Sequence, residues 1–433
     1  MFNKRLCACA AVLAAILIIF CDPTLAQIEW VRSPRNPVLD IGEAETWDSG
    51  GVRDPSVLFK DGVFEMWYTG GGPGFTDLGE VGRALSIDGA SWRKDKDNPV
   101  LKKGGSGAWD ALGLLTPYVL FDEGIYKMWY TGAGMDGVVA IGYATSTDGV
   151  HWTKFEGNPL IKPGEFNTWD GFAVLSPVVI REQDRYKMWY VGLVPSRWQI
   201  GYATSPDGIR WTKFEDNPVF SGGETGTWDA LGASVHCVLG KDGTYIMWYS
   251  GVGEDRQQIG GALSEDGVRW TKESESPVLT IGQTDSWEST NVSSPAVMLS
   301  GDTARMWYRG TDDKRISRIG MATSSRTPTF VEERSIEVAL PQTYRLFQNY
   351  PNPFNEGTVL SYFIPSGGQI RLSIYGENGQ LVRTLVQTAQ RSGRHSVTWE
   401  GRDDRGRRIA TGIYFYRLMA GPFRSTKKMV LVR

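Results

Sequence analysis

The chain has 433 residues, which is enough for two or more domains. Its formal net charge of -3 carries no electrostatic signature of nucleic-acid or anionic-membrane binding, so we expect no nucleic-acid partner. The 52 glycines, together with 17 residues each of Trp, Tyr and Phe, favour an all-β protein with many tight turns.

Residues 1–26 have the pattern of a secretory signal peptide. Lys4 and Arg5 precede an apolar run, and a small-residue cleavage site follows it at Ala26. No later segment is apolar for long enough to span a bilayer, so we expect no transmembrane segment. Of the four cysteines only Cys237 remains after cleavage, which excludes an internal disulfide framework and favours a buried thiol.

Residues 27–325 contain five copies of one unit. The tripeptide Met-Trp-Tyr marks each copy, with its tryptophan at Trp67, Trp129, Trp189, Trp248 and Trp307. Each copy offers short strand candidates bounded by Gly, Asp and Pro, and in four copies an Asp-Gly turn joins the last two. Five antiparallel four-stranded sheets repeated radially predict a five-bladed β-propeller.

The fifth copy stops near residue 325 without an Asp-Gly hairpin or a fourth strand. The missing strand is present at the start of the mature chain. "IEWVRSPRNPVL" aligns without a gap on "VHWTKFEGNPLI", which places Trp30 on Trp152 and Asn36 on Asn158. We therefore predict that the N-terminal strand closes blade five and leaves no open sheet edge.

Two repeated acidic positions favour structural roles. The hairpins of the type "SIDGASW" resemble the Asp-box of carbohydrate-active propellers, in which the Asp ties down the turn. An acid also follows a tryptophan once in every copy, and five symmetric copies are more typical of a loop lock than of a catalytic site. These acids are Asp48, Asp110, Asp170, Asp229 and Glu288.

One position near the start of the innermost strand differs among the copies. Its occupants are Asp54, Thr116, Ser176, Ser234 and Ser294. Because innermost strands line the central channel, these side chains should surround a polar funnel with a single carboxylate. Arg53 can orient a substrate there, and His236 in blade four is a core residue, a metal ligand or a proton shuttle.

The segment "RDPSVLFKDGVFEMWYTG" around Asp54 resembles the first blade of glycosidases in glycoside hydrolase families 43 and 32. Its "RDP" is also similar to that of mannoside phosphorylases. The resemblance covers residues 27 to about 330. It implies a glycoside hydrolase-like enzyme acting on an oligo- or polysaccharide. The resemblance also implies that Asp54 acts as the base, as the nucleophile or as the carboxylate that holds the sugar.

Glycoside cleavage commonly uses two carboxyl groups, yet the other inner strands present hydroxyls. A second acid must then come from upper loops, where Glu80 and Asp255 are the candidates. Trp198 lies outside the repeated tryptophan positions and offers a sugar a stacking face. The expected substrate-binding residues are Arg53, Thr116, Ser176, Trp198, Ser234, His236 and Ser294. The missing acids keep a second reading open, namely a carbohydrate-binding or surface-interaction propeller without catalysis.

The sequence shows no ligand spacing for a catalytic metal, so we expect no metal site and no cofactor. A structural Ca²⁺ bound by oxygen atoms alone stays open, because no spacing predicts it. Nothing indicates an oligomer, and we expect a monomer.

Residues 326–341 lose the repeat and are predicted to be a linker. The segment 342–433 contains "FQNYPNPFNEGTVLSYFIP" and "SGRHSVTWEGRDDRGRRIATGIYFYRL" and ends in "KKMVLVR". It resembles the type IX secretion C-terminal sorting domain, which is similar to the immunoglobulin-like domain of flagellar hook-capping proteins. The strand pattern predicts a small immunoglobulin-like β-sandwich. The resemblance implies the type IX secretion machinery as a partner, in an outer-membrane bacterium, and a secreted or cell-surface-attached protein.

Overall fold

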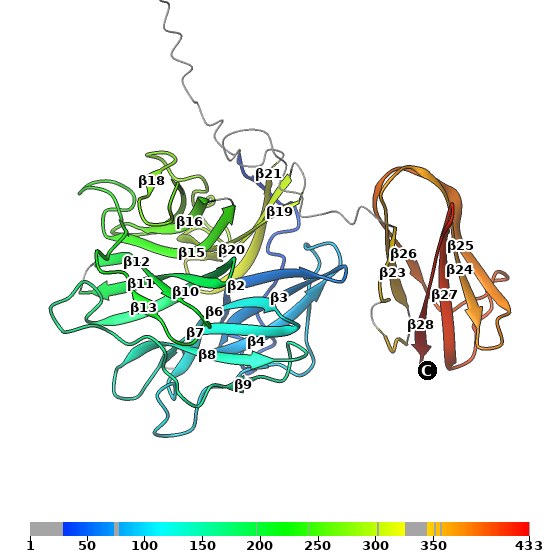
Figure 1. Ribbon diagram of the computed structural model, residues 1–433, viewed down its shortest axis with the longest axis horizontal. Helices are drawn as coiled ribbons and strands as arrows, with labels where there is room; N and C mark the ends of the chain where they lie inside the picture. Colours follow the sequence, from blue (N-terminus) through cyan, green and yellow to red (C-terminus); the bar gives the residue numbers. More distant parts are fainter. Residues whose placement is uncertain are drawn as a thin grey trace, which may run out of the picture.

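The computed structural model describes residues 29–72, 78–195, 197–241, 243–300, 303–324, 344–349, 352–355 and 357–432. The predicted signal peptide at 1–26 and the linker at 326–341 lie outside these residues. The described residues form strands only, and none of them belongs to a helix that could cross a membrane. Figure 1 shows the strands up to β21 in one body and the later strands in another.

The first body is all-β, and its described strands form five groups of antiparallel neighbours, which we call blades; the parallel bridges β2–β21 and β12–β15 join some of these groups into larger sheets. Blade one has β2 (Gly51–Lys60), β3 (Val63–Gly71), β4 (Glu80–Ser86) and β5 (Arg93–Lys94). Blade two has β6 (Gly113–Asp122), β7 (Ile125–Ala133), β8 (Val139–Ser146) and β9 (Thr153–Lys154). Blade three has β10 (Ala173–Glu182), β11 (Arg185–Val194), β12 (Arg197–Ser205) and β13 (Thr212–Lys213), and the short β14 (Phe220–Ser221) also pairs with β12.

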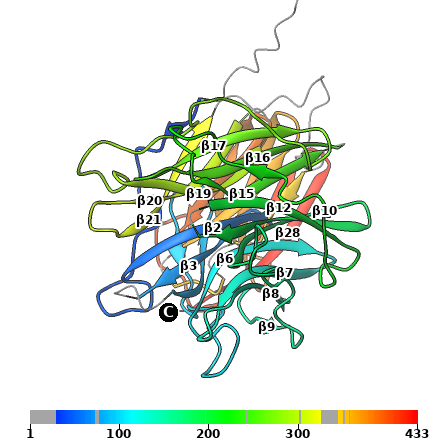
Figure 2. The same ribbon diagram turned by 90° about the vertical axis from the view of Figure 1, so that its left-hand side faces the viewer.

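Blade four has β15 (Gly232–Lys241), β16 (Thr244–Val252), β17 (Gln257–Ser264) and β18 (Thr271–Lys272). Blade five has β19 (Asn291–Ser300), β20 (Thr303–Thr311) and β21 (Ser317–Ser324). Its fourth strand is β1 (Val31–Arg32), which pairs antiparallel with β21, as Val31 opposite Thr323 shows. Asn36 then donates from Nδ2 to the Tyr308 hydroxyl over 3.1 Å. The prediction that the N-terminal strand closes blade five is confirmed. Figure 2 shows β20 and β21 beside β2 and β3, which completes the ring.

The tryptophans of the Met-Trp-Tyr repeat are fully buried between blades, where large aromatic side chains contribute most to burial. Four of them, Trp67, Trp129, Trp189 and Trp307, donate the indole N–H to the glycine carbonyl of the next blade's hairpin, as Trp67 does to Gly149 over 3.0 Å. Blade five has no such hairpin, so Trp248 lacks this acceptor. Trp30 packs edge-on against it with ring centroids 6.4 Å apart. Within the described residues, neither indole N–H finds a hydrogen-bond acceptor.

The five repeated acids have the structural role that the sequence predicted. Each one locks its loop by an ion pair within its own blade. Each is buried and pairs with a cation on the fourth strand of its own blade. The N–O distances are 2.6 Å for Asp48–Lys94, 2.5 Å for Asp110–Lys154, 2.6 Å for Asp170–Lys213, 2.6 Å for Asp229–Lys272 and 2.8 Å for Glu288–Arg32. The N-terminal strand therefore also supplies the cation that locks blade five.

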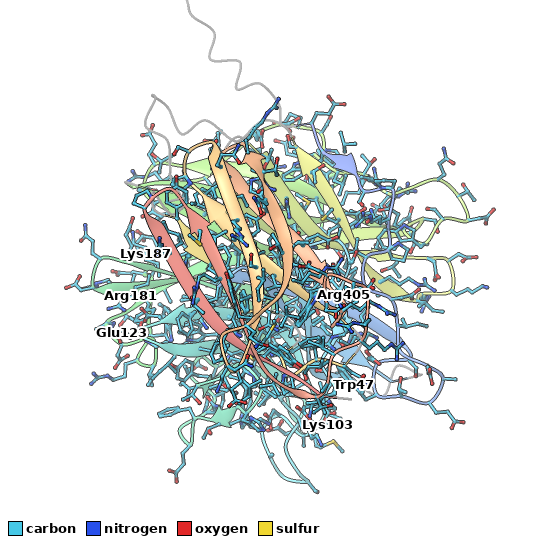
Figure 3. All side chains as sticks on the ribbon, turned by 90° about the vertical axis from the view of Figure 1, so that its right-hand side faces the viewer. Trp47, Lys103, Glu123, Arg181, Lys187 and Arg405 are labelled. Carbon is cyan, nitrogen blue, oxygen red and sulfur yellow. The ribbon has the colours of Figure 1, made fainter. Side chains whose placement is uncertain are left out.

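Ion pairs and hydrogen bonds also join neighbouring blades away from the axis. Figure 3 shows Glu123, Arg181 and Lys187 along one edge of the propeller. Arg181 of blade three lies 3.0 Å from Glu123 of blade two, and Lys187 donates to the Tyr245 hydroxyl of blade four over 2.5 Å. The ring is thus connected by polar contacts as well as by its aromatic core.

The second body is the predicted β-sandwich. One sheet contains β22 (Arg345–Leu346), β23 (Thr358–Ile364) and β26 (Gly393–Trp399). The other contains β24 (Gly368–Gly376), β25 (Leu381–Gln390), β27 (Gly412–Ala420) and β28 (Phe423–Leu431). Inward-facing residues such as Leu360, Leu372 and Trp399 are fully buried and form its core.

We predict that Lys154→Met lowers the free energy of unfolding by about 2 kcal/mol, because it leaves the Asp110 carboxylate buried without its cation. Arg32→Met should cost a similar amount at the closure of blade five. Lys96→Met is the matched control, since its ammonium group is 88% exposed and should contribute little. Urea unfolding measures all three. Equal stability of the Lys154 and Lys96 variants would contradict the lock.

Candidate functional site

Each innermost strand carries a β-bulge near its start. The pairing register skips between Arg53 and Ser56 in blade one, and at the equivalent place in blades two, three and five. In four blades the bulged residue has a positive φ, at 55° for Asp54, 45° for Thr116, 51° for Ser176 and 52° for Ser294. A bulge redirects a side chain, and here the same residues reach the channel. Blade four differs, because its extra residue is His236, between Val235 and Cys237.

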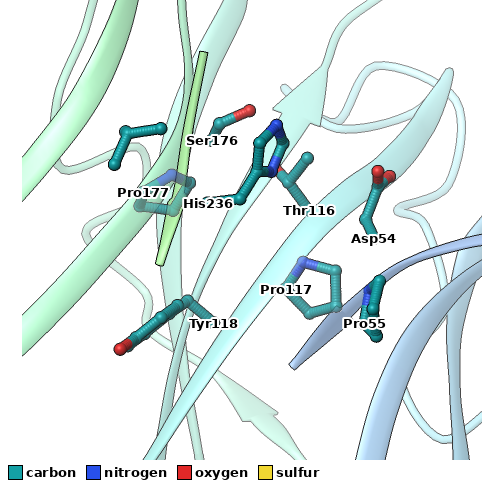
Figure 4. Close-up of a pocket in the computed structure, with 9 residues that line it drawn as sticks. Asp54, Pro55, Thr116, Pro117, Tyr118, Ser176, Pro177 and His236 are labelled. Carbon is teal, nitrogen blue, oxygen red and sulfur yellow. The ribbon is translucent and has the colours of Figure 1, made fainter. Parts of the chain in front are cut away.

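These bulges surround a cavity on the propeller axis. Asp54, Thr116, Ser176 and His236 line it together with Pro55, Pro117, Tyr118, Pro177 and Val235. Figure 4 shows the polar groups of Asp54, Thr116 and Ser176 and the His236 ring at one end, with Pro117 and Tyr118 toward the other. Beyond it the channel becomes apolar, with Leu58, Leu120 and Leu299 among its lining residues. Four of the predicted site residues therefore share one small polar cavity.

Asp54 is 8% exposed and is held from two sides. Its Oδ1 accepts a hydrogen bond of 2.8 Å from the Ser294 hydroxyl of blade five. Its Oδ2 forms an ion pair with Arg53 Nε at 3.8 Å, and Arg53 is itself held by the carbonyl of Leu78 at 2.6 Å. An ionised carboxylate in this position accepts protons and hydroxyl hydrogen bonds.

Hydroxyl groups tie three of the five bulges to the blade before them. Thr69, Thr131 and Ser250 stand at the position after Met-Trp-Tyr and accept the backbone N–H of the next blade's bulge residue. The distances are 3.0 Å to Thr116, 2.9 Å to Ser176 and 2.9 Å to Ser294. Val191 and Arg309 hold the same position in blades three and five, where this contact cannot form. The blades that follow them carry Ser234 and Asp54.

Arg309 of blade five is a cation at the position after Met-Trp-Tyr that the sequence analysis did not single out. Its Nε donates to the hydroxyls of Ser317 at 2.9 Å and Thr311 at 3.2 Å. Burial lowers the pKa of Arg309 to about 10, although the Asp54 charge opposes this, and the Arg53 charge adds to it. A signal was present in the sequence, because "MWYRG" breaks a repeat that reads "MWYTG" in blades one and two.

His236 lies across the cavity from Asp54 (Figure 4). Its Nε2 is 3.0 Å from the Ser234 hydroxyl. Burial lowers the pKa of His236 to about 4, although the Asp54 charge acts against this. The imidazole is therefore neutral near pH 7 and can both donate and accept a hydrogen bond.

Three predicted residues lie elsewhere, and two of them are not in loops as expected. Glu80 begins β4 and accepts the Lys103 N–H at 3.1 Å. Trp198 is part of β12, half-buried against the core. Both hairpins pair further than the sequence suggested, which extends the strands to these positions. Asp255 is exposed in the loop before β17, and none of the three lines the cavity around Asp54.

A metal centre is not evident in the described part of the chain, where no three His, Cys, Asp or Glu side chains converge. The structural Ca²⁺ stays a prediction without an identified ligand set. Cys237 is buried next to the cavity, and burial raises the pKa of its thiol to about 12, so it is an inert core residue.

Comparisons with known proteins bear on both bodies. Residues 363–421 match the FlgD Ig-like domain. The chain is 30% identical over 242 residues to the uncharacterized protein MT1551 of Mycobacterium tuberculosis, covering 54% of this chain and 78% of that protein. It is 24% identical to a 1,2-beta-oligomannan phosphorylase of Thermoanaerobacter sp., covering 66% of this chain and 95% of the relative.

Solved structures give the same fold. A putative glycoside hydrolase from Parabacteroides distasonis superposes with a TM-score of 0.58 at 18% identity, over 71% of this chain and 99% of its own. A structure from the GH130 family of mannoside phosphorylases, which contains glycoside hydrolases targeting β-1,2 mannosidic linkages in Candida mannan, has a TM-score of 0.57 at 20% identity over 69% and 94%. The neighbours thus match the mannoside phosphorylase resemblance, and they do not single out families 43 and 32.

We predict that His236 titrates near pH 4 in the folded protein, compared with about 6.5 for a free side chain. NMR signals of the three histidines can be assigned with His236→Gln. His151 is an internal control, because its hydrogen bond to Asp148 raises its pKa above the ordinary value. A His236 midpoint between pH 6 and 7 would show that the cavity leaves the imidazole solvated.

Proposed function

The chain belongs to the same family as the Mycobacterium tuberculosis protein MT1551, and from the cavity around Asp54 and the similarity to a 1,2-beta-oligomannan phosphorylase we propose a carbohydrate-active propeller. It acts on glycosidic bonds of an oligo- or polysaccharide, with Asp54 as the essential carboxylate. The relative that spans most of this propeller, the 1,2-beta-oligomannan phosphorylase, supports this activity.

The observation that carries the proposal is the placement of Asp54. It is the one acid among the described residues lining the cavity, at a position where the other blades have hydroxyls. Its ion pair with Arg53 and its hydrogen bond from Ser294 hold the carboxylate in place and orient it. In that state it can take a proton from an attacking nucleophile or hold a sugar hydroxyl.

The named substrates of the relatives suggest the first sugars to test. The Thermoanaerobacter relative is a 1,2-beta-oligomannan phosphorylase, and the GH130 neighbour is described for β-1,2 mannosidic linkages. A β-linked manno-oligosaccharide is therefore the first substrate class, and the reaction is to be examined with and without inorganic phosphate.

A second candidate is a propeller that binds carbohydrate without cleaving it. The observation that favours it is the absence of a second carboxylate from the described cavity lining, since glycoside hydrolysis commonly uses two. Glu80 and Asp255, the proposed suppliers of that acid, lie outside this lining.

We further propose that the protein is exported and works as a monomer. The FlgD Ig-like match at 363–421 supports a C-terminal module of the kind that the type IX secretion machinery recognises. On this proposal residues 342–433, joined to a periplasmic reporter in a bacterium that has this machinery, direct the reporter outside the cell. A reporter that stays in the periplasm would oppose the sorting role.

We predict that Asp54→Asn lowers kcat/KM for glycoside cleavage by about 10²- to 10⁴-fold, because it removes the carboxylate that accepts the proton and keeps the size of the side chain. Product analysis on the full chain, with manno-oligosaccharides and a polysaccharide panel, measures this. Asp97→Asn is the control, since Asp97 is exposed and outside the cavity.

The outcomes separate the two candidates. Unchanged activity in Asp54→Asn would reject the assigned carboxylate. Saccharide binding by calorimetry without product from the native chain would favour the binding module, and Asp54→Asn should then weaken that binding.

A further inference from the structure

We propose that the apolar end of the propeller channel is a binding site for the straight hydrocarbon chain of an amphiphile, such as an alkyl or acyl group. This apolar tube is the cavity beyond the polar one, and Leu58, Leu120 and Leu299 are among its lining residues. Its volume is about 420 Å³. A dry apolar cavity of about 150 Å³ is enough to bind benzene, so the tube has room for a larger apolar ligand.

All five blades contribute to the wall of the apolar tube. Each innermost strand supplies one aliphatic residue, paired with the residue two positions before the Met-Trp-Tyr tryptophan. This aliphatic ring consists of Leu58, Leu120, Ile180, Leu239 and Met298. Because the innermost strands enclose the axis, the cavity is a tube and not a surface groove, and a folded partner protein cannot enter it.

The apolar tube is open at the aliphatic ring and narrows at its other end. The ring residues are half-buried, whereas Val238, one step deeper in the wall, is fully buried. Pro55, Tyr118 and His236 line both the tube and the smaller polar cavity, so they separate the two. A strand rises about 3.3 Å per residue, so the run from Pro55 to Leu58 makes the tube about 10 Å deep. A deep, enclosed tube fits a linear chain.

Two backbone N–H groups of the tube wall are satisfied within the protein. The Ser56 hydroxyl accepts the N–H of Val119 in the next blade over 2.9 Å. The Cys237 sulfur accepts the N–H of Val297 in the next blade over 3.4 Å. Since buried polar groups of proteins are generally paired in this way, these wall positions have no donor left for a polar ligand.

The charge of the wall determines which class of ligand fits. Arg181 is the one cation among the described lining residues, and its guanidinium contacts Asp122 and lies 3.0 Å from Glu123. His236, whose pKa burial lowers to about 4, is neutral near pH 7. A charged group inside the tube would therefore be buried without a counter-charge, which is costly. A hydrocarbon chain instead leaves water for an aliphatic wall, and its head group stays at the mouth.

The test is calorimetric titration of the full native chain with n-hexanol, n-octanol and n-decanol, which share one uncharged head group. We expect the affinity to rise about fourfold with each added methylene until the chain fills the tube.

Two variants of the aliphatic ring locate the binding. Leu120→Trp adds bulk to the ring and should lower the affinity for n-decanol about tenfold or more. Met298→Gln adds no bulk but places an amide in the wall, and should also weaken binding about tenfold. Ile125→Trp is the matched control, because Ile125 is 39% exposed in the same blade as Leu120 and lies outside the described lining. Thermal unfolding shows whether each variant folds.

An affinity that does not change with chain length, or no binding of n-decanol, would overturn the inference. So would native-like binding in both Leu120→Trp and Met298→Gln, because the chain would then be bound elsewhere on the protein. The saccharide experiments with Asp54→Asn are independent of this outcome, since Asp54 is not among the described residues lining the tube.

Discussion

The pairing of β1 with β21 is the contact on which both the ring and its candidate site depend. It completes blade five with a strand from the other end of the propeller sequence, and Arg32 on that strand locks Glu288. The closure brings blade five against blade one, where Ser294 reaches Asp54 across 240 positions of sequence. Without this junction Asp54 would lose its hydrogen-bond donor and the neighbouring Arg309. Closing the ring therefore also assembles the candidate site.

The chemistry of the site is concentrated where the internal symmetry is broken. Two junctions keep a threonine and one keeps a serine that ties down the next bulge by accepting its N–H. The other two junctions have Val191 and Arg309, and the blades after them carry the His236 bulge and Asp54. A repeat satisfies its buried backbone groups by a common rule. Where the hydroxyl contact to the next bulge is absent, the following blade carries an ionisable side chain at its bulge. The polar lining of the cavity is therefore asymmetric and can orient a ligand.

The described polar lining also indicates how the channel is divided. Asp54, Thr116 and His236 lie at one end, whereas the lining beyond them is mostly apolar and includes Leu58, Leu120 and Leu299. Burial at that boundary keeps His236 neutral. The five lock acids are each paired with a cation of their own blade, whereas Asp54 pairs with Arg53 and lines the cavity on the axis.

The repeat in the sequence was sufficient to predict the blades, the closing strand, the lock acids and the position of Asp54, because each depends on local patterns that recur at regular spacing. The sandwich followed in the same way from its strand pattern. Arg309, the extended hairpins that place Glu80 and Trp198 on strands, and the contact of Ser294 with Asp54 were decided by the tertiary structure. Those features depend on which blades meet and on how a bulge turns each side chain. Strand spacing alone does not contain that information, because it specifies each sheet and leaves open the direction in which neighbouring sheets face one another.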